Sequence, residues 1–204
     1  MNLLAHIYLS GSDDQVKIGN FIGDYVKGRG YRRYEPRVSK GILVHRNIDS
    51  FTDHHPVPRK VKSLLRPYYR KYAGIVVDLF YDHYLTNYWG IYSNTPLDTF
   101  IDEFYRLLEK YYPILPAAVQ EFVPRMIRHN RLYTYITLDG VEQALQMMAR
   151  YTSLPEKTSK AMQVLSDHYE LIGDNFREFF PRIIEHVSEN HQVDVEYYPL
   201  WGNS

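Results

Sequence analysis

Residues 36–52 read PRVSKGILVHRNIDSFT, and this stretch decides the fold class. Pro36 suits the first turn of a helix, because a backbone N–H at that position has no partner within the helix. Four residues then fall on adjoining positions of one helical face: Ile42, His45, Ile48 and Asp49. Pro56 and Pro58 interrupt the pattern. The stretch therefore predicts a long helix that carries titratable side chains beside apolar ones.

Helix signals continue in both directions from this stretch. Ser12-Asp13-Asp14 offers a cap for an earlier helix, Thr95-Pro96 for a later one, and Asp139-x-x-Glu142 has the form of a capping box. The expected helices run from that first cap to about 27, then over about 36–52, 59–72, 75–89, 96–112, 117–128 and 139–152, followed by two helices that Pro155 and Gly173 divide.

No segment alternates convincingly as a strand, no period repeats, and no linker-like stretch interrupts the chain. We therefore predict an all-α fold. It forms a single compact helical domain over residues 1–190, followed by an irregular C-terminal tail over residues 191–204.

The composition excludes several classes of protein. The chain has 204 residues and no cysteine, so disulfides, Cys-ligated zinc and thiol nucleophiles are impossible. Its formal net charge of zero excludes a uniformly basic nucleic-acid binder and an acidic disordered chain. No apolar run approaches the roughly 20 residues that cross a bilayer. The N-terminal segment also lacks the features of a signal peptide, so we expect a cytoplasmic protein without a membrane partner.

The zero net charge hides an asymmetry. Residues 1–75 hold 14 Lys and Arg against 6 Asp and Glu, whereas residues 76–204 hold 10 against 18. A division of this kind indicates a basic face for an acidic partner. The alternative is an ordinary solvated helix surface.

Asp24 follows two glycines at helical spacing. Gly19 and Gly23 are four residues apart, and so are Asn20 and Asp24. Small residues at that spacing let a neighbouring helix approach closely, which would place Asp24 beside the packed seam. The alternative is a carboxylate that water solvates at a helix end.

Two further pairs place titratable groups on single helical faces. His45 and Asp49 stand at i and i+4, from which they can bind one cation together, although a surface pair has the same spacing. Asp78 and Asp82 share a face of a largely apolar helix, where burying them is costly unless a metal ion or Arg46 compensates them.

These residues form a His and Asp set without thiolates, completed by two histidines, His6 and His83. For His6, in an apolar segment, a hydrogen-bonded core histidine is the alternative. Oxygen-rich ligation with one or two imidazoles suits Mn²⁺ or Mg²⁺ better than structural zinc. Such a site lowers the pKa of a bound water and polarises a phosphoryl oxygen. The chain has no Gly-x-Ser-x-Gly elbow, phosphate-binding loop or dinucleotide fingerprint.

Four segments in this order resemble one known family. They are MNLLAH at 1–6, GNFIGDYVKG at 19–28, GILVHRNIDSFTDHHP at 41–56 and DLFYDH at 78–83. Together they are similar to the acyl carrier protein phosphodiesterase family, also called acyl carrier protein hydrolase. The resemblance covers the chain essentially from end to end, and the motifs are specific only as a set.

The resemblance implies an all-helical enzyme distantly related to the HD-domain phosphohydrolases. It also implies a divalent metal cofactor, with Mn²⁺ favoured over Mg²⁺ or other cations. The implied reaction hydrolyses the phosphodiester between 4′-phosphopantetheine and a serine of holo-acyl carrier protein, a step linked to fatty acid biosynthesis and lipid metabolism. One departure stands out, because no His in the chain is followed by Asp, and only the reverse order occurs, as at Asp53-His54.

Site roles follow from the resemblance as hypotheses. The metal ligands would be Asp24, His45, Asp49 and Asp82, with His6 or Asp78 in or beside the ligand set. Asp24 would be essential for turnover. Arg46 or Lys27 would stabilise the negative charge that develops on the phosphoryl group. His83 would protonate the serine oxygen as it leaves.

Nine basic residues would meet the acidic carrier protein. They are Arg29, Arg32, Arg33, Arg37, Arg59, Lys60, Lys62, Arg66 and Arg70. One alternative function is an HD-like metal phosphohydrolase that acts on a nucleotide or another small phosphodiester. A second is a non-enzymatic helical module that binds acidic proteins or nucleic acid. Buried pairs of aspartates argue against that module, because simple binding does not require them.

Overall fold

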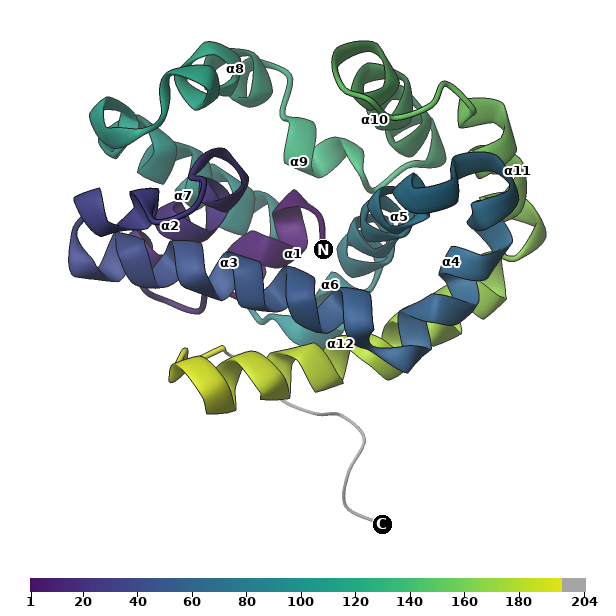
Figure 1. The fold of residues 1–204 in the computed structure, drawn as a ribbon, viewed down its shortest axis with the longest axis horizontal. Helices are drawn as coiled ribbons and strands as arrows, with labels where there is room; N and C mark the ends of the chain where they lie inside the picture. The colour runs from purple at the N-terminus through teal and green to yellow at the C-terminus, as the bar shows by residue number, and fades with distance from the viewer. Residues whose placement is uncertain (196–204) are drawn as a thin grey trace.

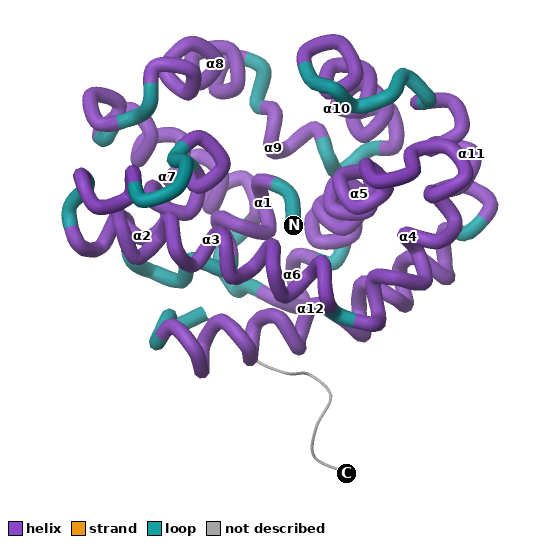
Figure 2. Tube along the Cα trace, in the orientation of Figure 1, coloured by secondary structure: helices purple, strands orange, loops and turns teal. Residues whose placement is uncertain are grey.

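The computed structural model describes residues 1–195 of the chain, and within them all regular structure is helical (Figure 2). The α-helices are α1 (Leu3–Tyr8), α2 (Asp14–Phe21), α3 (Pro36–His54), α4 (Pro56–Tyr69), α5 (Ala73–Asn87), α6 (Trp89–Tyr92), α7 (Leu97–Lys110), α8 (Ala117–Arg128), α9 (Arg131–Thr134), α10 (Leu138–Tyr151), α11 (Thr158–Asp167) and α12 (Tyr169–His191). Short 3₁₀ turns are η1 (Gly23–Tyr25), η2 (Gly30–Arg33), η3 (Arg70–Tyr72) and η4 (Tyr112–Ile114). The predicted all-α class is confirmed.

Helices α5 and α12 form the centre of the core. Most of α5 is buried, and α12 packs against α3, α4 and α5, running below α3 and α4 in Figure 1. Large aromatic side chains fill the contact: Tyr81, Tyr84, Phe176, Phe179 and Phe180. Burying aromatic rings of this size supplies much of the hydrophobic free energy of folding.

The α2–α3 pair is held together by glycines. A Cβ atom on Gly19 would overlap the Val38 carbonyl oxygen, and one on Gly41 would overlap that of Val16. The two backbones therefore approach to a distance that no side chain permits. This close seam, predicted for Gly19, brings the polar face of α3 against the segment that follows α2.

Several helix limits differ from the sequence-based prediction. Helix α2 ends at Phe21 and not near 27, because the chain tightens into η1 and then turns away. Helix α4 begins at Pro56 and not near 59, because both prolines lie in its first turn, where their missing N–H groups are tolerated. The break between the last two helices falls at His168, so Gly173 lies inside α12.

The helix starts were predicted with mixed success. Asp13 caps α2 as predicted, and its Oδ1 accepts from the N–H of Gln15 and Val16. Thr137 caps α10 through its Oγ1, so Asp139 lies in the first turn and the predicted capping box does not form. Pro96 takes the cap position of α7.

The predicted tail begins where α12 ends, at His191, and residues 196–204 lie outside the described part of the chain. Within residues 1–195, no helix has both the length and the apolar character needed to cross a membrane.

Candidate metal centre

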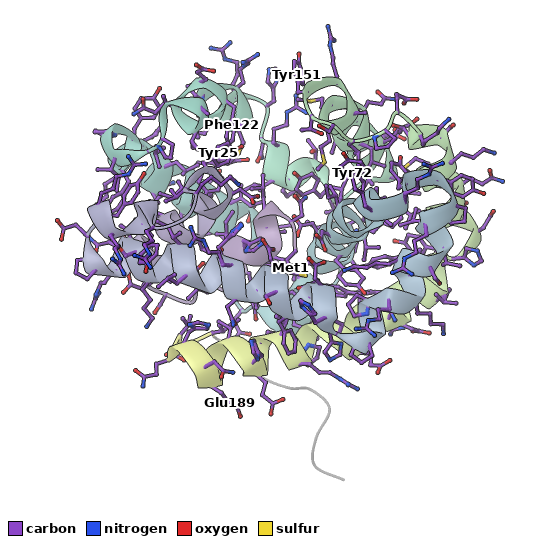
Figure 3. The ribbon with its side chains drawn as sticks, viewed as in Figure 1. Met1, Tyr25, Tyr72, Phe122, Tyr151 and Glu189 are labelled. Atoms are coloured by element: carbon purple, nitrogen blue, oxygen red, sulfur yellow. The ribbon has the colours of Figure 1, made fainter. Side chains whose placement is uncertain are left out.

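Four of the predicted site residues meet where α1, α3 and η1 converge. His6 comes from α1, His45 and Asp49 from successive turns of α3, and Asp24 from η1. His45 Nε2 lies 3.2 Å from Asp49 Oδ2 and 3.4 Å from Asp24 Oδ1, and His6 Nε2 lies 3.1 Å from Asp49 Oδ1. We call these four residues the His–Asp cluster. Met1, which lies beside the cluster, is labelled in Figure 3 near the middle of the molecule.

The two imidazole rings of the cluster are stacked. The ring centroids of His6 and His45 lie 4.1 Å apart with an interplanar angle of 19°. This parallel arrangement directs both Nε2 atoms at the same carboxylate, one at each oxygen of Asp49. The spacing of His45 and Asp49 follows from one turn of α3, whereas the position of His6 depends on how α1 packs.

A buried network fixes the tautomer of His6. Asn20 donates its Nδ2 hydrogens to the His6 carbonyl oxygen and to Ser10 Oγ, both at 2.9 Å. Ser10 Oγ in turn donates to the His6 carbonyl oxygen at 2.7 Å. Asn20 Oδ1 is therefore an acceptor, and it lies 2.8 Å from His6 Nδ1. His6 must donate from Nδ1, which leaves Nε2 of the neutral ring with a lone pair.

That lone pair faces a second electron-rich atom. Burial lowers the pKa of His6 to about 4, so the ring is neutral at pH 7. Burial opposes ionisation of Asp49, but its pairing with His45 and the positive charge of the Met1 amino group hold the pKa of its carboxyl well below the ordinary value. An imidazole lone pair and a carboxylate oxygen 3.1 Å apart repel each other unless a cation lies between them.

His45 presents the second unsatisfied group. Its side chain is only 7% exposed, and neither ring nitrogen has a hydrogen-bond partner among residues 1–195. Burial would lower the pKa of His45, but the carboxylates of Asp24 and Asp49 raise it to about 9. The two carboxylates therefore favour a positive charge at this site, and either a proton on His45 or a bound metal ion can supply it.

The donor atoms fit a divalent metal ion. One ligand atom from each of His6, His45 and Asp49 can be chosen so that all three lie within 4.8 Å of one another. Neighbouring ligands about 2.1 Å from an octahedral cation lie about 3 Å apart, close to the separations seen here. The Asp24 side chain is 74% exposed, so the cluster is open to solvent on that side. Two imidazoles and two carboxylates suit Mn²⁺ and related cations.

Gly23 makes room for this arrangement. A Cβ atom at position 23 would overlap the His45 side chain. The 3₁₀ turn that begins at Gly23 then brings the Asp24 carboxylate to His45. Pairing with His45 lowers the pKa of Asp24, so this carboxylate is ionised at neutral pH.

Asp78 and Asp82 lie on α5 and bind the start of α1. Both oxygens of buried Asp82 accept backbone hydrogen bonds, from Leu4 N at 2.9 Å and Ala5 N at 3.0 Å. Asp78 Oδ2 lies 3.3 Å from the amino group of Met1, which is also 3.4 Å from Asp49 Oδ1. The structure thus places Asp82 outside the His–Asp cluster, because its oxygens are committed to capping α1.

His83 is also placed outside the cluster. Its Nδ1 lies 2.8 Å from the Tyr135 carbonyl oxygen and must donate to it. Its Nε2 therefore accepts from the Tyr169 hydroxyl, 2.9 Å away. Both ring nitrogens are occupied in holding α5 against its neighbours, which leaves the predicted general acid without a free proton to give.

Among residues 1–195, no contact joins either of the two predicted charge stabilisers to the cluster. Arg46 Nη2 donates to the Val26 carbonyl oxygen at 2.6 Å, and its guanidinium lies 5.6 Å from the Tyr31 ring centroid. It holds the chain just after η1 in place. Lys27 is exposed in the same loop. The charge-stabilising role of Arg46 and Lys27 therefore stays a prediction.

The nine basic residues separate into groups. Four of them line one cavity beside α4: Arg59, Lys62, Arg66 and Arg70. Lys60 is exposed on α4 outside it. The others lie around η2, where Arg37 pairs with Asp13 at 2.9 Å, Arg32 and Arg33 lie over neighbouring tyrosine rings, and Arg29 is exposed.

Asn20, Ser10 and Gly23 are the site residues that sequence reasoning did not assign. In the sequence, Asn20 is a polar residue among the apolar neighbours Ile18, Phe21 and Ile22, and that was the available signal. The structure shows it to be fully buried. Its partner His6 is 14 residues away on another helix, so the pairing itself has no local signature.

The chain is similar to a known family over most of its length. Residues 1–183 match the model of a family described as acyl carrier protein phosphodiesterase. A Klebsiella pneumoniae protein of that name is 31% identical over 95% of this chain and 100% of its own length. Proteins with the same name from Photorhabdus laumondii and Yersinia pestis are 31% and 27% identical over 91% and 90% of this chain and 94% and 96% of their own lengths. No solved structure matches the chain significantly.

Proposed function

Because the chain belongs to the acyl carrier protein phosphodiesterase family, we propose that it is a metal-dependent hydrolase of holo-acyl carrier protein. The bond cleaved is the phosphodiester between 4′-phosphopantetheine and a serine of the carrier protein. The products are apo-acyl carrier protein and 4′-phosphopantetheine. The family supports the phosphodiesterase activity, and the metal dependence and the bond cleaved are the proposal.

The observation that carries the proposal is the convergence of unshared electron pairs in the His–Asp cluster. The Nε2 lone pair of His6 and the carboxylate of Asp49 converge at 3.1 Å, and buried His45 has no hydrogen-bond partner in residues 1–195. A packed protein rarely retains such a cluster unless a cation occupies it. A metal ion held by histidine and aspartate next to solvent can also activate a water molecule for phosphodiester hydrolysis.

His6, His45 and Asp49 would hold the cation, which we propose to be Mn²⁺, with Asp24 at the solvent side. When bound, the metal supplies positive charge to a phosphoryl oxygen and makes an adjacent water more acidic. Asn20 keeps Nε2 of His6 directed at the site by accepting the proton of Nδ1. Asp24 accepts a hydrogen bond from the attacking water and so orients it.

The reaction exchanges one bond to phosphorus for another. The water loses one proton to solvent as its oxygen forms a bond to phosphorus, and the bond from phosphorus to the serine oxygen breaks. The leaving oxygen takes a proton from solvent at the open side of the cluster, where the Asp24 side chain is 74% exposed. This assignment replaces the predicted role of His83, whose ring nitrogens are both engaged.

The test is incubation of the protein with holo-acyl carrier protein, read by intact mass. The protein is first treated with a chelator and then assayed with and without added Mn²⁺. We expect the carrier protein to lose the mass of phosphopantetheine only when metal is present. Cleavage that is undiminished without metal would contradict the metal dependence.

The same assay decides the alternative substrate. A small phosphodiester such as bis(4-nitrophenyl) phosphate is supplied without carrier protein. Rapid cleavage of this compound together with an intact holo-carrier protein would support an HD-like phosphohydrolase of small substrates and would contradict the proposed function.

A further inference from the structure

A basic cavity of about 240 Å³ lies between α4, η3 and the start of α5. Helices α4 and α5 are neighbours on the right side of Figure 1, and Figure 3 labels Tyr72 at the end of η3. Five cationic side chains and one carboxylate line the cavity: Arg59, Lys62, Arg66, Arg70, Lys71 and Asp53. We call it the α4 cavity.

The charge of the α4 cavity is poorly compensated. Asp53 is committed to Lys62, whose Nζ lies 2.7 Å from Asp53 Oδ1 and is mostly buried. The other four cations have no acidic partner among residues 1–195. Clustered cations with one carboxylate repel one another, and a ligand with several negative charges relieves that repulsion.

The backbone at the cavity is also unusual. Arg70 has a φ of +49° and a ψ of −119°, a conformation that side chains other than glycine rarely adopt. A conformation of this kind persists only where the surrounding packing enforces it. Here it turns the chain between α4 and α5 so that Arg70 and Lys71 both line the cavity.

The α4 cavity adjoins the His–Asp cluster along two helices. Asp53 lies four residues after Asp49 on α3. Gly74 lies four residues before Asp78 on α5, and Asp78 pairs with the Met1 amino group beside the cluster. One turn of helix advances about 5.4 Å, so a group bound in the cavity lies close to one bound at the cluster. A single extended ligand would reach both.

The basic residues around η2 differ in this respect. Arg37 is paired with Asp13, while Arg32 and Arg33 lie against Tyr31 and Tyr34. The larger of the two pockets described in the structure is the α4 cavity, and none of these η2 residues lines it. The structure therefore separates basic residues that line one cavity from basic residues scattered over the surface around η2.

We propose that the α4 cavity binds clustered carboxylate side chains of the protein substrate, close to its modified serine. This inference rests on the proposed function, because the substrate there is an acidic carrier protein. Charge complementarity and continuity with the cluster select this occupant. The cavity then positions the carrier protein while the cluster acts on the phosphodiester.

The test compares two charge-reversing double variants of the full chain. The first is Arg59→Glu with Arg66→Glu in the cavity, and the second is Arg125→Glu with Arg128→Glu on the exposed side of α8. Both make the same change in net charge. Binding of apo-acyl carrier protein is measured by calorimetry, because this form has no bond to cleave, and kcat and KM are measured with the holo form.

We expect the cavity variant to raise the Kd for apo-carrier protein about tenfold or more, and KM by a similar factor, while kcat is largely retained. The α8 variant should change Kd by less than about threefold. Equal effects of the two variants would show general steering by net charge and would overturn the proposal.

A second pair of variants leaves every arginine in place. A Cβ atom on Gly74 would lie 3.4 Å from Lys62 Cε and 3.6 Å from Lys62 Nζ, which is an ordinary contact. Gly74→Glu therefore adds a carboxylate at the cavity, whereas Gly74→Ala adds only the methyl group. The proposal expects weaker carrier-protein binding for Gly74→Glu than for Gly74→Ala.

Two further outcomes are distinguishable. Inorganic phosphate that binds the wild type but not the cavity variant, with carrier-protein Kd unchanged, would identify a small-anion site and overturn the proposal. Wild-type protein that binds apo-carrier protein through the cavity but never releases phosphopantetheine would support this inference and contradict the proposed function.

Discussion

Asn20 decides which nitrogen of His6 faces the carboxylate of Asp49. Its amide hydrogens are committed to the His6 carbonyl oxygen and Ser10 Oγ, so only its oxygen is available to His6 Nδ1. Partners of this kind orient metal-binding histidines and fix their tautomer. The side chain is fully buried, so no water competes for these bonds.

Replacing Asn20 with Ala should therefore weaken metal binding. Losing such a partner typically reduces metal affinity by about 10- to 100-fold. The measurement is the Kd for Mn²⁺ by calorimetry. Ser10→Ala is the matched control, because Ser10 belongs to the same network but does not touch the His6 ring. Unchanged Mn²⁺ affinity in folded Asn20→Ala would remove Asn20 from the site.

Local pairs in the site could be predicted from the sequence, but long-range pairs could not. His45 and Asp49 are one helical turn apart, so their contact follows from the predicted helix alone. Asp82 and Leu4 are separated by 78 positions, and nothing in either segment identifies the other as its partner. Asp82 was predicted as a metal ligand, and the structure instead shows both of its oxygens accepting hydrogen bonds from the backbone of α1.

At the scale of elements, α1 depends on α5. A helix of six residues is not stable by itself, because nucleating it costs more than so few hydrogen bonds return. Asp82 satisfies two of the N–H groups that its first turn leaves unpaired. Because α1 carries His6, the hydrogen bonds from α1 to Asp82 also fix where His6 lies relative to α3.

Replacing His83 tests whether this residue of α5 stabilises the fold or acts as a general acid. It links α5 to the Tyr135 carbonyl oxygen and the Tyr169 hydroxyl, so His83→Gln should destabilise the fold by about 2 kcal/mol. Turnover of folded variant should stay near that of the wild type. A general acid would behave differently, because its loss reduces kcat by about 10²- to 10⁴-fold. Thermal unfolding and kcat together separate the two roles.

The pH dependence gives a further check on His83. Burial lowers the pKa of His83, so the folded protein favours the neutral ring and the unfolded chain binds a proton more readily. The stability that wild type gains from His83 is thus present above about pH 6.5 and lost as pH falls through the folded pKa. The stability difference between wild type and His83→Gln should shrink between pH 7 and pH 5. A constant difference would contradict this account.

Helix existence was predictable because its signals are local. Pro36 and Asp13 begin helices where the sequence indicates. Gly173 was expected to end a helix, but it lies inside α12, where a Cβ atom would come within 3.1 Å of the Tyr88 hydroxyl. That glycine serves packing, and packing partners are not visible in one sequence.

At the scale of the whole molecule, the structure shows where the excess positive charge of residues 1–75 lies. The His–Asp cluster lies entirely within the basic residues 1–75, and the α4 cavity takes its cations from the same segment. Residues 76–204 supply most of the aromatic core through α5 and α12. The sequence predicted the asymmetry, but only the folded chain separates the cavity arginines from those around η2.

The central proposal is that His6, His45 and Asp49 hold a divalent cation. The most direct test is titration of Mn²⁺ into wild type, Asp49→Asn and Asp53→Asn, followed by electron paramagnetic resonance of free Mn²⁺. Asp53 lies one turn along α3 from Asp49 and outside the cluster, so it is the matched control. We predict saturable Mn²⁺ binding in wild type and Asp53→Asn that Asp49→Asn loses. Equal binding by all three proteins, or none in the wild type, would contradict the account.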